Sequence, residues 1–295
     1  MKRTTVLPAG AFFAIVFGLW GQPQFEVASV KVSTASQDSL PIQFRGFGRQ
    51  SGGPGSTTPG QYTATGISLK NILFRRAFPL NEYQYVAPSW MDKEVYDIAV
   101  KAPPGITQDQ FSVMLQNLLI QRFKIELHHE QREHASYDMV LAKGGSRMKP
   151  SKFDETVPLD AGPGSGSLKL EHDADGFPSI PDAAGPMTLF TARNGQTVVV
   201  TNRFTVQQLI DYLALNLNIP IFDKTGLKGG FAYMLHYERP GIAAVSADAG
   251  ASPAMNVTPT LFDALQSQLG LKLEPHKAMI DVLVIDKAEK KPIEN

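Results

Sequence analysis

The sequence predicts an α+β fold of two tandem β-α-β-β-α-β-β repeats that follow one N-terminal strand. Two stretches of the chain share one order of strand, helix and turn patterns. Their helical segments place apolar residues three and four positions apart, and their final segments alternate apolar with polar residues. We therefore expect the first repeat at residues 60–145 and the second at residues 195–290.

Size and composition set limits on the class of protein. The chain has 295 residues, enough for one large domain or two of ordinary size. Lys plus Arg and Asp plus Glu both number 28, so no basic field predicts nucleic-acid binding. The chain has no cysteine, which excludes disulfides, thiol catalysis and thiolate metal sites.

The N-terminus has the pattern of a signal peptide. Lys2 and Arg3 precede a short apolar run from Val6 to Trp20, and small or polar residues follow. This predicts a signal peptide over residues 1–21 and a periplasmic or secreted protein without a membrane span after its removal. The cleavage motif is poor, so an uncleaved N-terminal anchor is the alternative.

Residues 22–59 should hold one strand and one loop. The strand is "FEVASVKVS" from Phe25. The run from Gly46 to Gly60 is rich in glycine but contains no phosphate-loop motif, so we expect a mobile loop there. A long loop beside a rigid scaffold is also a candidate binding loop.

The first repeat begins with a strand at Gly60. Ser68 is placed to cap the helix that follows, and Thr107 with Gln110 forms a capping box before the next helix. The apolar stripe of that second helix predicts its buried face, with Phe111, Met114, Leu115, Leu118 and Leu119. Two alternating strands, "KIELHHE" and "ASYDMVLAK", should close the repeat.

The second repeat follows the same order from Gly195. Thr205 is placed as the first N-cap, and Thr258 followed by Pro259 predicts the second. The strands "LKLEPHK" and "MIDVLVIDK" should close this repeat before a tail at residues 291–295. Residues 146–194 separate the repeats and are predicted as a loop with one hairpin.

Several motifs together resemble one bacterial family. They are "FEVASVK", "YDIAVKAP", "LLIQRFKIELHHEQRE", "DKTGLKGGFAYML" and "LFDALQSQLGLKLEPHKAMIDVLVID". The chain resembles an exported domain of unknown function that is abundant in soil bacteria. Some members of that family are fused to BlaR-like antirepressor peptidases, which implies sensing or binding. Ala77-Phe78 and Val86-Ala87-Pro88 depart from the pattern of the family, which has an aromatic Ala-Tyr and a Gly-Gly there.

Each repeat is also similar to the short N-terminal domain of secretins and TonB-dependent transducers. The shared pattern is a helix, two strands around a turn, a second helix and a valine-rich strand. Domains of that kind bind other envelope proteins and have no catalytic residues. The resemblance implies the same kind of partner for this chain, an envelope protein or peptide.

The tetrapeptide Asp-Lys-Thr-Gly is best known as the phosphorylation site of P-type ion pumps. Here Leu227 follows, where a pump has Thr, and the chain lacks the membrane helices of a pump. Asp223 is placed to accept backbone hydrogen bonds, and Gly226 can adopt a positive φ. We therefore interpret the segment as a structural turn, made by Asp223, Lys224, Thr225, Gly226 and Leu227.

The segment "HHEQREH" carries the candidate metal ligands His128, Glu130 and His134. It matches neither HExxH nor HxxEH, and it is predicted at a strand end and turn rather than on a helix. We expect a solvated polar hairpin, with no metal site and no cofactor.

Aromatic residues surround the first predicted turn. Tyr83, Tyr85 and Trp90 are candidate binding residues, together with Phe78. Core packing between helix and sheet is the simpler interpretation, and a ligand platform is the alternative. Arg75 and Arg76 are predicted on a solvated helix face.

No nucleophile–base pair, serine-hydrolase elbow or metal set emerges from the sequence. We therefore assign no catalytic residue and expect a non-enzymatic binding or sensor module outside the cytoplasm. Sheet edges are natural docking sites for an extended peptide. The alternative is a secreted hydrolase with its site between the two repeats. The sequence predicts no oligomeric state.

Overall fold

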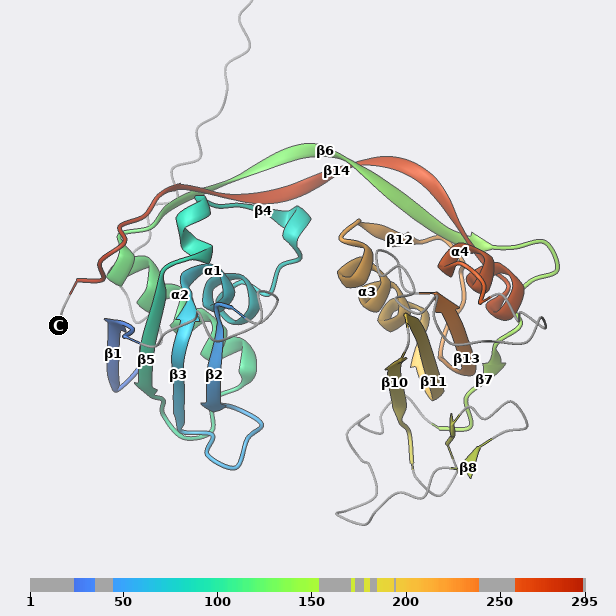
Figure 1. Cartoon of the computed structure of the whole chain (residues 1–295), viewed down its shortest axis with the longest axis horizontal. Coiled ribbons are helices and arrows are strands. Elements are labelled where there is room, and N and C mark those ends of the chain that lie inside the picture. The colour runs from blue at the N-terminus through green and yellow to red at the C-terminus, as the bar shows by residue number, and fades with distance from the viewer. Residues whose placement is uncertain are drawn as a thin grey trace, which may run out of the picture. The chain divides into compact units, whose positions relative to one another are not determined.

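The computed structural model describes residues 24–34, 45–153, 171–172, 178–180, 185–193, 195–238 and 258–293. The predicted signal peptide, residues 1–21, lies outside these residues. Helices and mainly antiparallel strands are mixed along the chain, which confirms the α+β class (Figure 1).

The chain divides into two compact units. Unit 1 gathers residues from 1–80, 87–128 and 285–295, and unit 2 gathers residues from 81–86 and 129–284. These boundaries differ from the predicted repeats at 60–145 and 195–290. The long strands β6 (Glu126–Leu141) and β14 (Leu271–Lys287) contribute residues to both units.

Unit 1 contains a four-stranded antiparallel sheet in the order β1-β5-β3-β2. Its strands are β1 (Val27–Val32), β2 (Phe47–Gly52), β3 (Gln61–Ser68) and β5 (Val95–Lys101). Its helical segments are α1 (Leu69–Ile72), the π-helix η2 (Leu73–Ala77), the short 3₁₀ helix η4 (Ser89–Asp92) and α2 (Gln108–Phe123).

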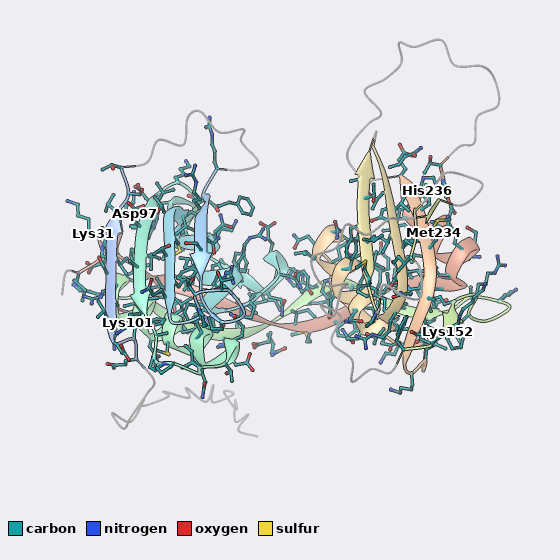
Figure 2. All side chains as sticks on the ribbon, turned by 90° about the horizontal axis from the view of Figure 1, so that it is seen from below. Lys31, Asp97, Lys101, Lys152, Met234 and His236 are labelled. Atoms are coloured by element: carbon teal, nitrogen blue, oxygen red, sulfur yellow. The ribbon has the colours of Figure 1, made fainter. Side chains whose placement is uncertain are left out.

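Helices cover one face of this sheet, and no described helix covers the other face. Tyr96, Ile98 and Val100 of β5 are buried, because alternate side chains of a strand point to opposite faces. Asp97 and Lys101 project from the other face, beside Lys31 of β1 (Figure 2). The apolar stripe predicted for α2 is buried, which confirms its core-facing side.

Hydroxyl caps define where the helices begin. The side chains of Ser68, Thr107 and Thr205 each accept a hydrogen bond from the backbone three residues on, which confirms the predicted caps. The predicted cap at Thr258 is wrong. Thr260 caps α4 (Leu261–Ala264) instead, and the Pro259 carbonyl accepts the Glu238 N–H, so Pro259 precedes the helix.

Unit 2 contains a second antiparallel sheet in the order β10-β11-β13-β7. Its strands are β7 (Lys149–Pro150), β10 (Thr188–Arg193), β11 (Gln196–Thr205) and β13 (Gly230–Glu238). Its helical segments are the short 3₁₀ helix η3 (Glu82–Gln84), α3 (Val206–Leu217), α4 and the π-helix η6 (Leu265–Leu269). The short strands β8 (Glu171–His172) and β9 (Pro178–Ser179) pair with each other.

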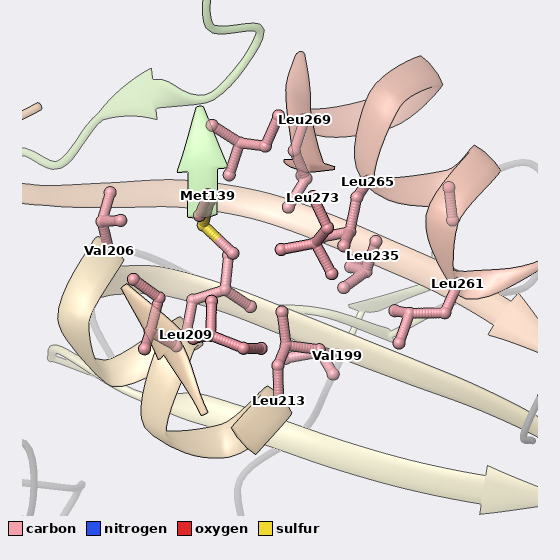
Figure 3. Packing of buried hydrophobic residues seen from close by; sticks show 14 of the residues in the cluster. Met139, Val199, Val206, Leu209, Leu213, Leu235, Leu261, Leu265, Leu269 and Leu273 are labelled. Carbon is pink, nitrogen blue, oxygen red and sulfur yellow. The ribbon is translucent and has the colours of Figure 1, made fainter. Parts of the chain in front are cut away.

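The core of unit 2 draws side chains from all of its layers. Met139, Val199, Leu209, Leu235 and Leu265 are fully buried and converge from strands and helices (Figure 3). Burial of one such side chain stabilises the fold by roughly 1.5–3 kcal/mol. Several of them come from the apolar stripes that predicted α3 and the helix at residues 261–269.

Two short strands join a third sheet in the order β12-β6-β14-β4. The strand β12 (Ile221–Asp223) pairs in parallel with β6, where Ile221 lies opposite Tyr137. The strand β4 (Tyr85–Val86) pairs in parallel with β14, where Tyr85 lies opposite Leu283. Each short strand therefore pairs with the final strand of the other half of the chain.

The closing segments differ from the prediction. The two strands expected at the end of each repeat are one continuous strand in each case, β6 and β14. The residues of β6 include neither glycine nor proline, so the segment lacks the chemistry of a tight turn. Because β6 and β14 also pair with each other, neither strand needs to fold back on itself.

The glycine-rich run from Gly46 to Gly60 also differs from the prediction. Its first part forms β2, which pairs with β3, so a mobile loop is wrong for residues 47–52. Positive φ angles at Gly48 and Gly52 let the chain follow an irregular edge. In the predicted loop at residues 146–194, β10 forms a hairpin with β11 and adds an edge strand to the sheet.

Candidate functional site

The histidine-rich segment is part of β6 and forms no hairpin. The prediction of a strand end and turn there is wrong, because β6 continues to Leu141 beside β14. His128 Nδ1 lies 2.8 Å from an Asp286 oxygen, and His129 Nδ1 lies 2.7 Å from an Asp281 oxygen. These exposed pairs link β6 to β14, a structural role that accounts for both imidazoles.

The three candidate metal ligands do not converge. Glu130 forms an ion pair with Arg132, and the His134 ring lies 6.4 Å from the Tyr83 ring. Among the described residues, no three His, Cys, Asp or Glu side chains are arranged to hold a metal ion. The geometry therefore does not support a metal site made by His128, Glu130 and His134.

The aromatic candidates fall into different units. Tyr83 and Tyr85 belong to unit 2, whereas Trp90 belongs to unit 1. Tyr83 accepts a hydrogen bond from Asn81 at 3.1 Å, and burial raises the pKa of Tyr83. The ammonium group of Lys290 lies 5.8 Å from the centre of the Trp90 ring. All three side chains are half-buried.

The helix-face arginines Arg75 and Arg76 contact β2 side chains. The Arg75 guanidinium lies 4.8 Å from the centre of the Phe47 ring, and Arg76 Nε donates to Gln50 Oε1 at 3.2 Å. Arg75 is exposed and Arg76 is half-exposed, so solvent reaches this face.

The Asp-Lys-Thr-Gly segment forms an Asx turn after β12. Asp223 Oδ1 accepts hydrogen bonds from the Thr225 N–H at 2.8 Å and from its hydroxyl at 2.7 Å. Gly226 has a φ of +71°, and Leu227 packs against the core of unit 2. Lys224 donates its backbone N–H to the Met139 carbonyl of β6. The Oδ1 atom of Asp223 therefore stabilises the turn.

His236, which the motifs did not single out, is a partly buried titratable group of β13 (Figure 2). Burial lowers its pKa, so the neutral imidazole is favoured. Its Nε2 lies 3.3 Å from Gln196 Oε1, and its backbone exchanges hydrogen bonds with the Gln268 side chain. These contacts tie β13 to η6 and describe a structural histidine.

A pocket of about 320 Å³ lies in unit 1 between β1 and α2. One wall is the consecutive run Gln24 to Ala28, and the other is a single face of α2. The α2 residues are spaced three and four positions apart, as one helix face requires, and they are Met114, Asn117, Leu118, Gln121 and Arg122. Pockets for small molecules usually span roughly 300–1,000 Å³, so this volume suits a small ligand.

The pocket combines apolar and polar walls. Met114 and Leu118 are buried, and Phe25 meets the ring of Phe111 edge-on with centroids 5.4 Å apart. Polar side chains lie at its margin, including Gln121 and Arg122. Such a mixture is typical of ligand sites, where apolar surface supplies affinity and a few polar groups fix orientation.

Among the described residues, two charged side chains line the pocket, and one of them has a partner of opposite charge whereas the other does not. Glu26 lies 2.8 Å from Lys101 Nζ, and this hydrogen bond raises the pKa of Lys101. Arg122 donates from Nη1 to the Ile293 carbonyl at 3.2 Å, and no carboxylate of the described residues lies within ion-pair distance of it. The unmatched charge of the pocket is therefore positive.

Asn117 is a second unmatched group. Its Nδ2 is buried and has no hydrogen-bond partner among the described residues. Sequence patterns missed this site, because the α2 stripe was used only to predict the core. The sequence does contain a signal for this site. Asn117 and Gln121 lie four residues apart beside that stripe, and Arg122 follows them.

Of the helices that the structure describes, none has the length and apolar character needed to cross a membrane. No curated protein and no solved structure matches the chain. A model of one protein family matches residues 71–288, most of the chain. On this match, the chain belongs to the family described as "Protein of unknown function (DUF3738)".

Proposed function

We propose that this protein is a non-enzymatic binding or sensor module of the bacterial envelope or exterior, and that it takes its ligand in the β1–α2 pocket. The observation that carries the proposal is the composition of that pocket. Within one concave site of unit 1, apolar side chains lie beside a cation that has no carboxylate partner and a buried amide that has no hydrogen-bond partner among the described residues. These are the features expected of a site that binds a small molecule.

The order of elements supports a tandem repeat beneath this function. The first half runs β3-α1-β4-β5-α2-β6, and the second runs β11-α3-β12-β13-α4-β14. The main sheets also correspond, since β2-β3-β5-β1 in unit 1 parallels β10-β11-β13-β7 in unit 2. Similarity of each repeat to the short N-terminal domain of secretins and TonB-dependent transducers favours binding over catalysis.

The proposed location of the protein outside the cytoplasm rests on its N-terminal sequence. The basic and apolar pattern of residues 1–21 favours export to the periplasm or beyond. An exported ligand or an envelope protein is then the available partner.

The test uses the exported chain and one pocket-blocking variant. Ala28 lines the pocket and lies opposite the buried Val100, on the helix-facing side of the sheet, so Ala28→Trp fills the pocket. Val32 lies on the same strand, is 53% exposed and does not line the pocket, so Val32→Trp is the matched control. Each protein is incubated with bacterial envelope extract and examined by native mass spectrometry.

We expect a bound species on the wild type and on Val32→Trp, and its loss on Ala28→Trp. Equal binding by all three proteins would place the ligand elsewhere. No bound species, together with turnover in a broad hydrolase screen, would favour a secreted hydrolase and reject the binding module.

A further inference from the structure

We infer that the β1–α2 pocket is selective for a small amphipathic carboxylate, an inference that depends on the binding function proposed above. The chemistry of the pocket walls leads to this class of ligand in three steps, through charge, hydrogen bonding and apolar shape.

The charges that line the pocket favour an anionic ligand. Among the described residues that line the pocket, two have charged side chains, Glu26 and Arg122. Glu26 is neutralised by Lys101 at 2.8 Å, whereas Arg122 contacts a neutral carbonyl and retains most of its donors. A guanidinium matches the geometry of a carboxylate, which it can bind through two parallel hydrogen bonds. One unmatched cation favours a monoanion over a more highly charged phosphate group.

The second step is hydrogen bonding. Asn117 lies on the same face of α2 as Arg122, and its Nδ2 is buried without an acceptor among the described residues. A buried donor without a partner is unfavourable, so the Asn117 amide would gain a hydrogen bond by turning towards a ligand oxygen in the pocket. The exposed amide of Gln121 lies on the same wall and can contact the ligand at the rim.

The third step is apolar shape. Phe25, Met114 and Leu118 add apolar side chains to the mostly polar lining of the same pocket, and a purely polar acid would leave them in contact with water. The volume of about 320 Å³ is near the lower limit for small-molecule sites, roughly 300 Å³. A free acid with a short acyl chain or one aromatic ring therefore fits better than a length of peptide.

The experiment titrates the mature chain with octanoate and with 3-phenylpropanoate, followed by ¹⁵N NMR. The uncharged counterparts octanamide and 3-phenylpropanamide test the charge, and a short peptide with a free C-terminal leucine tests a protein source. Arg122→Gln removes the cation. Lys31→Gln removes an equal charge from β1 on the open face of the sheet, outside the pocket, and is the control.

We expect at least one acid to shift the amide signals of residues 24–28 and 114–122, and to bind more tightly than its amide. Arg122→Gln should weaken that binding about tenfold, because one charge-assisted pair is lost, whereas Lys31→Gln should stay within about twofold. Asn117→Leu, which has a similar shape, should also weaken binding while the protein stays at least as stable to heat as the wild type.

Three results would overturn the inference. They are no binding by either acid, equal binding of acid and amide, or equal effects of Arg122→Gln and Lys31→Gln. Tighter binding of the peptide than of both acids would also reject a free acid as the ligand. If Ala28→Trp abolishes capture of a ligand that has no carboxylate, this inference fails while the binding function stands. If Ala28→Trp has no effect on capture, the proposed function fails first.

Discussion

At the scale of single residues, Asp223 organises a turn through one oxygen atom. That oxygen accepts both the backbone and the hydroxyl hydrogen bonds of Thr225. The neighbouring φ of +71° at Gly226 completes the change in chain direction. In this chain, the motif known from ion pumps is therefore explained by the turn that it forms.

Asp223→Ala should lower the free energy of unfolding by about 1 kcal/mol, because two hydrogen bonds of the turn are lost. Asp223→Asn retains the oxygen acceptor and should cost less than half as much. Urea unfolding curves of the two variants check this. Equal losses would contradict the turn assignment, and radiolabelled phosphate on Asp223 after incubation with ATP would replace it with a covalent role.

Gly270 ends η6 at a φ of +70°, nearly the same as at Gly226, but its surroundings differ. A Cβ at Gly270 would lie 2.1 Å from the Gly145 carbonyl oxygen, whereas a Cβ at Gly226 would meet nothing within 4 Å. Gly226→Ala should therefore cost only the left-handed strain, about 1–2 kcal/mol. Gly270→Ala should cost roughly 3 kcal/mol or more, because the backbone must also shift. Similar melting temperatures for the two variants would refute the close approach.

Buried tyrosines make unit 1 sensitive to alkali. Burial raises the pKa of Tyr62 and of Tyr96 to about 12, from an ordinary value of 10.0. The folded state holds these protons more tightly, so their contribution is complete below pH 10 and is lost as the pH rises towards about 12. Tyr62→Phe should be less stable at neutral pH, since the bond to Gln50 is lost, but should lose less stability between about pH 10 and 12. Urea unfolding at several pH values tests this, and parallel curves would contradict it.

At the scale of elements, capping boxes set the start of two helices. In α2, Thr107 and Gln110 exchange hydrogen bonds between side chain and backbone, and Thr205 and Gln208 do the same in α3. These reciprocal bonds satisfy amide groups that a helix leaves without partners in its first turn.

Thr107→Ala and Thr205→Ala should each lower the free energy of unfolding by about 1 kcal/mol. The corresponding serine variants keep the hydroxyl acceptor and should recover most of that loss. Denaturant unfolding followed by circular dichroism provides the measurement. A serine variant as unstable as its alanine counterpart would show that the methyl group, rather than the cap, is responsible.

At the scale of the whole molecule, neither half of the chain contains all partners of its own strands. The strands β12 and β14 pair with β6, and both come from beyond residue 145. In return, β4 from the first half pairs with β14. The two halves are therefore expected to fold together, because an unpaired strand leaves backbone groups without partners.

A fragment of residues 60–145, the predicted first repeat, should lack a cooperative unfolding transition. The chain of residues 24–295 should show one. Urea unfolding and the dispersion of amide proton signals distinguish the two outcomes. Cooperative unfolding of the fragment would show that the first repeat folds independently of β12 and β14.

Local chemistry explains which features could be predicted from the sequence. The hydroxyl caps at Ser68, Thr107 and Thr205, the buried stripe of α2 and the α+β class all depend on residues close together in the chain. The cap at Thr258 was wrong because two threonines flank Pro259, and only the position of Glu238 decides between them. The candidate pocket was missed because Gln24 and Arg122 lie far apart in the sequence.

The sequence by itself determined the alternation of strands and helices, the capped helix starts and the turn at Asp223, since each depends on neighbouring side chains. Tertiary structure alone decided that β6 and β14 are single long strands, because they pair with each other although they lie more than a hundred residues apart in the sequence. It also decided which strands β4 and β12 join. Tertiary structure also decided the pocket, because its two walls meet only when α2 packs beside β1.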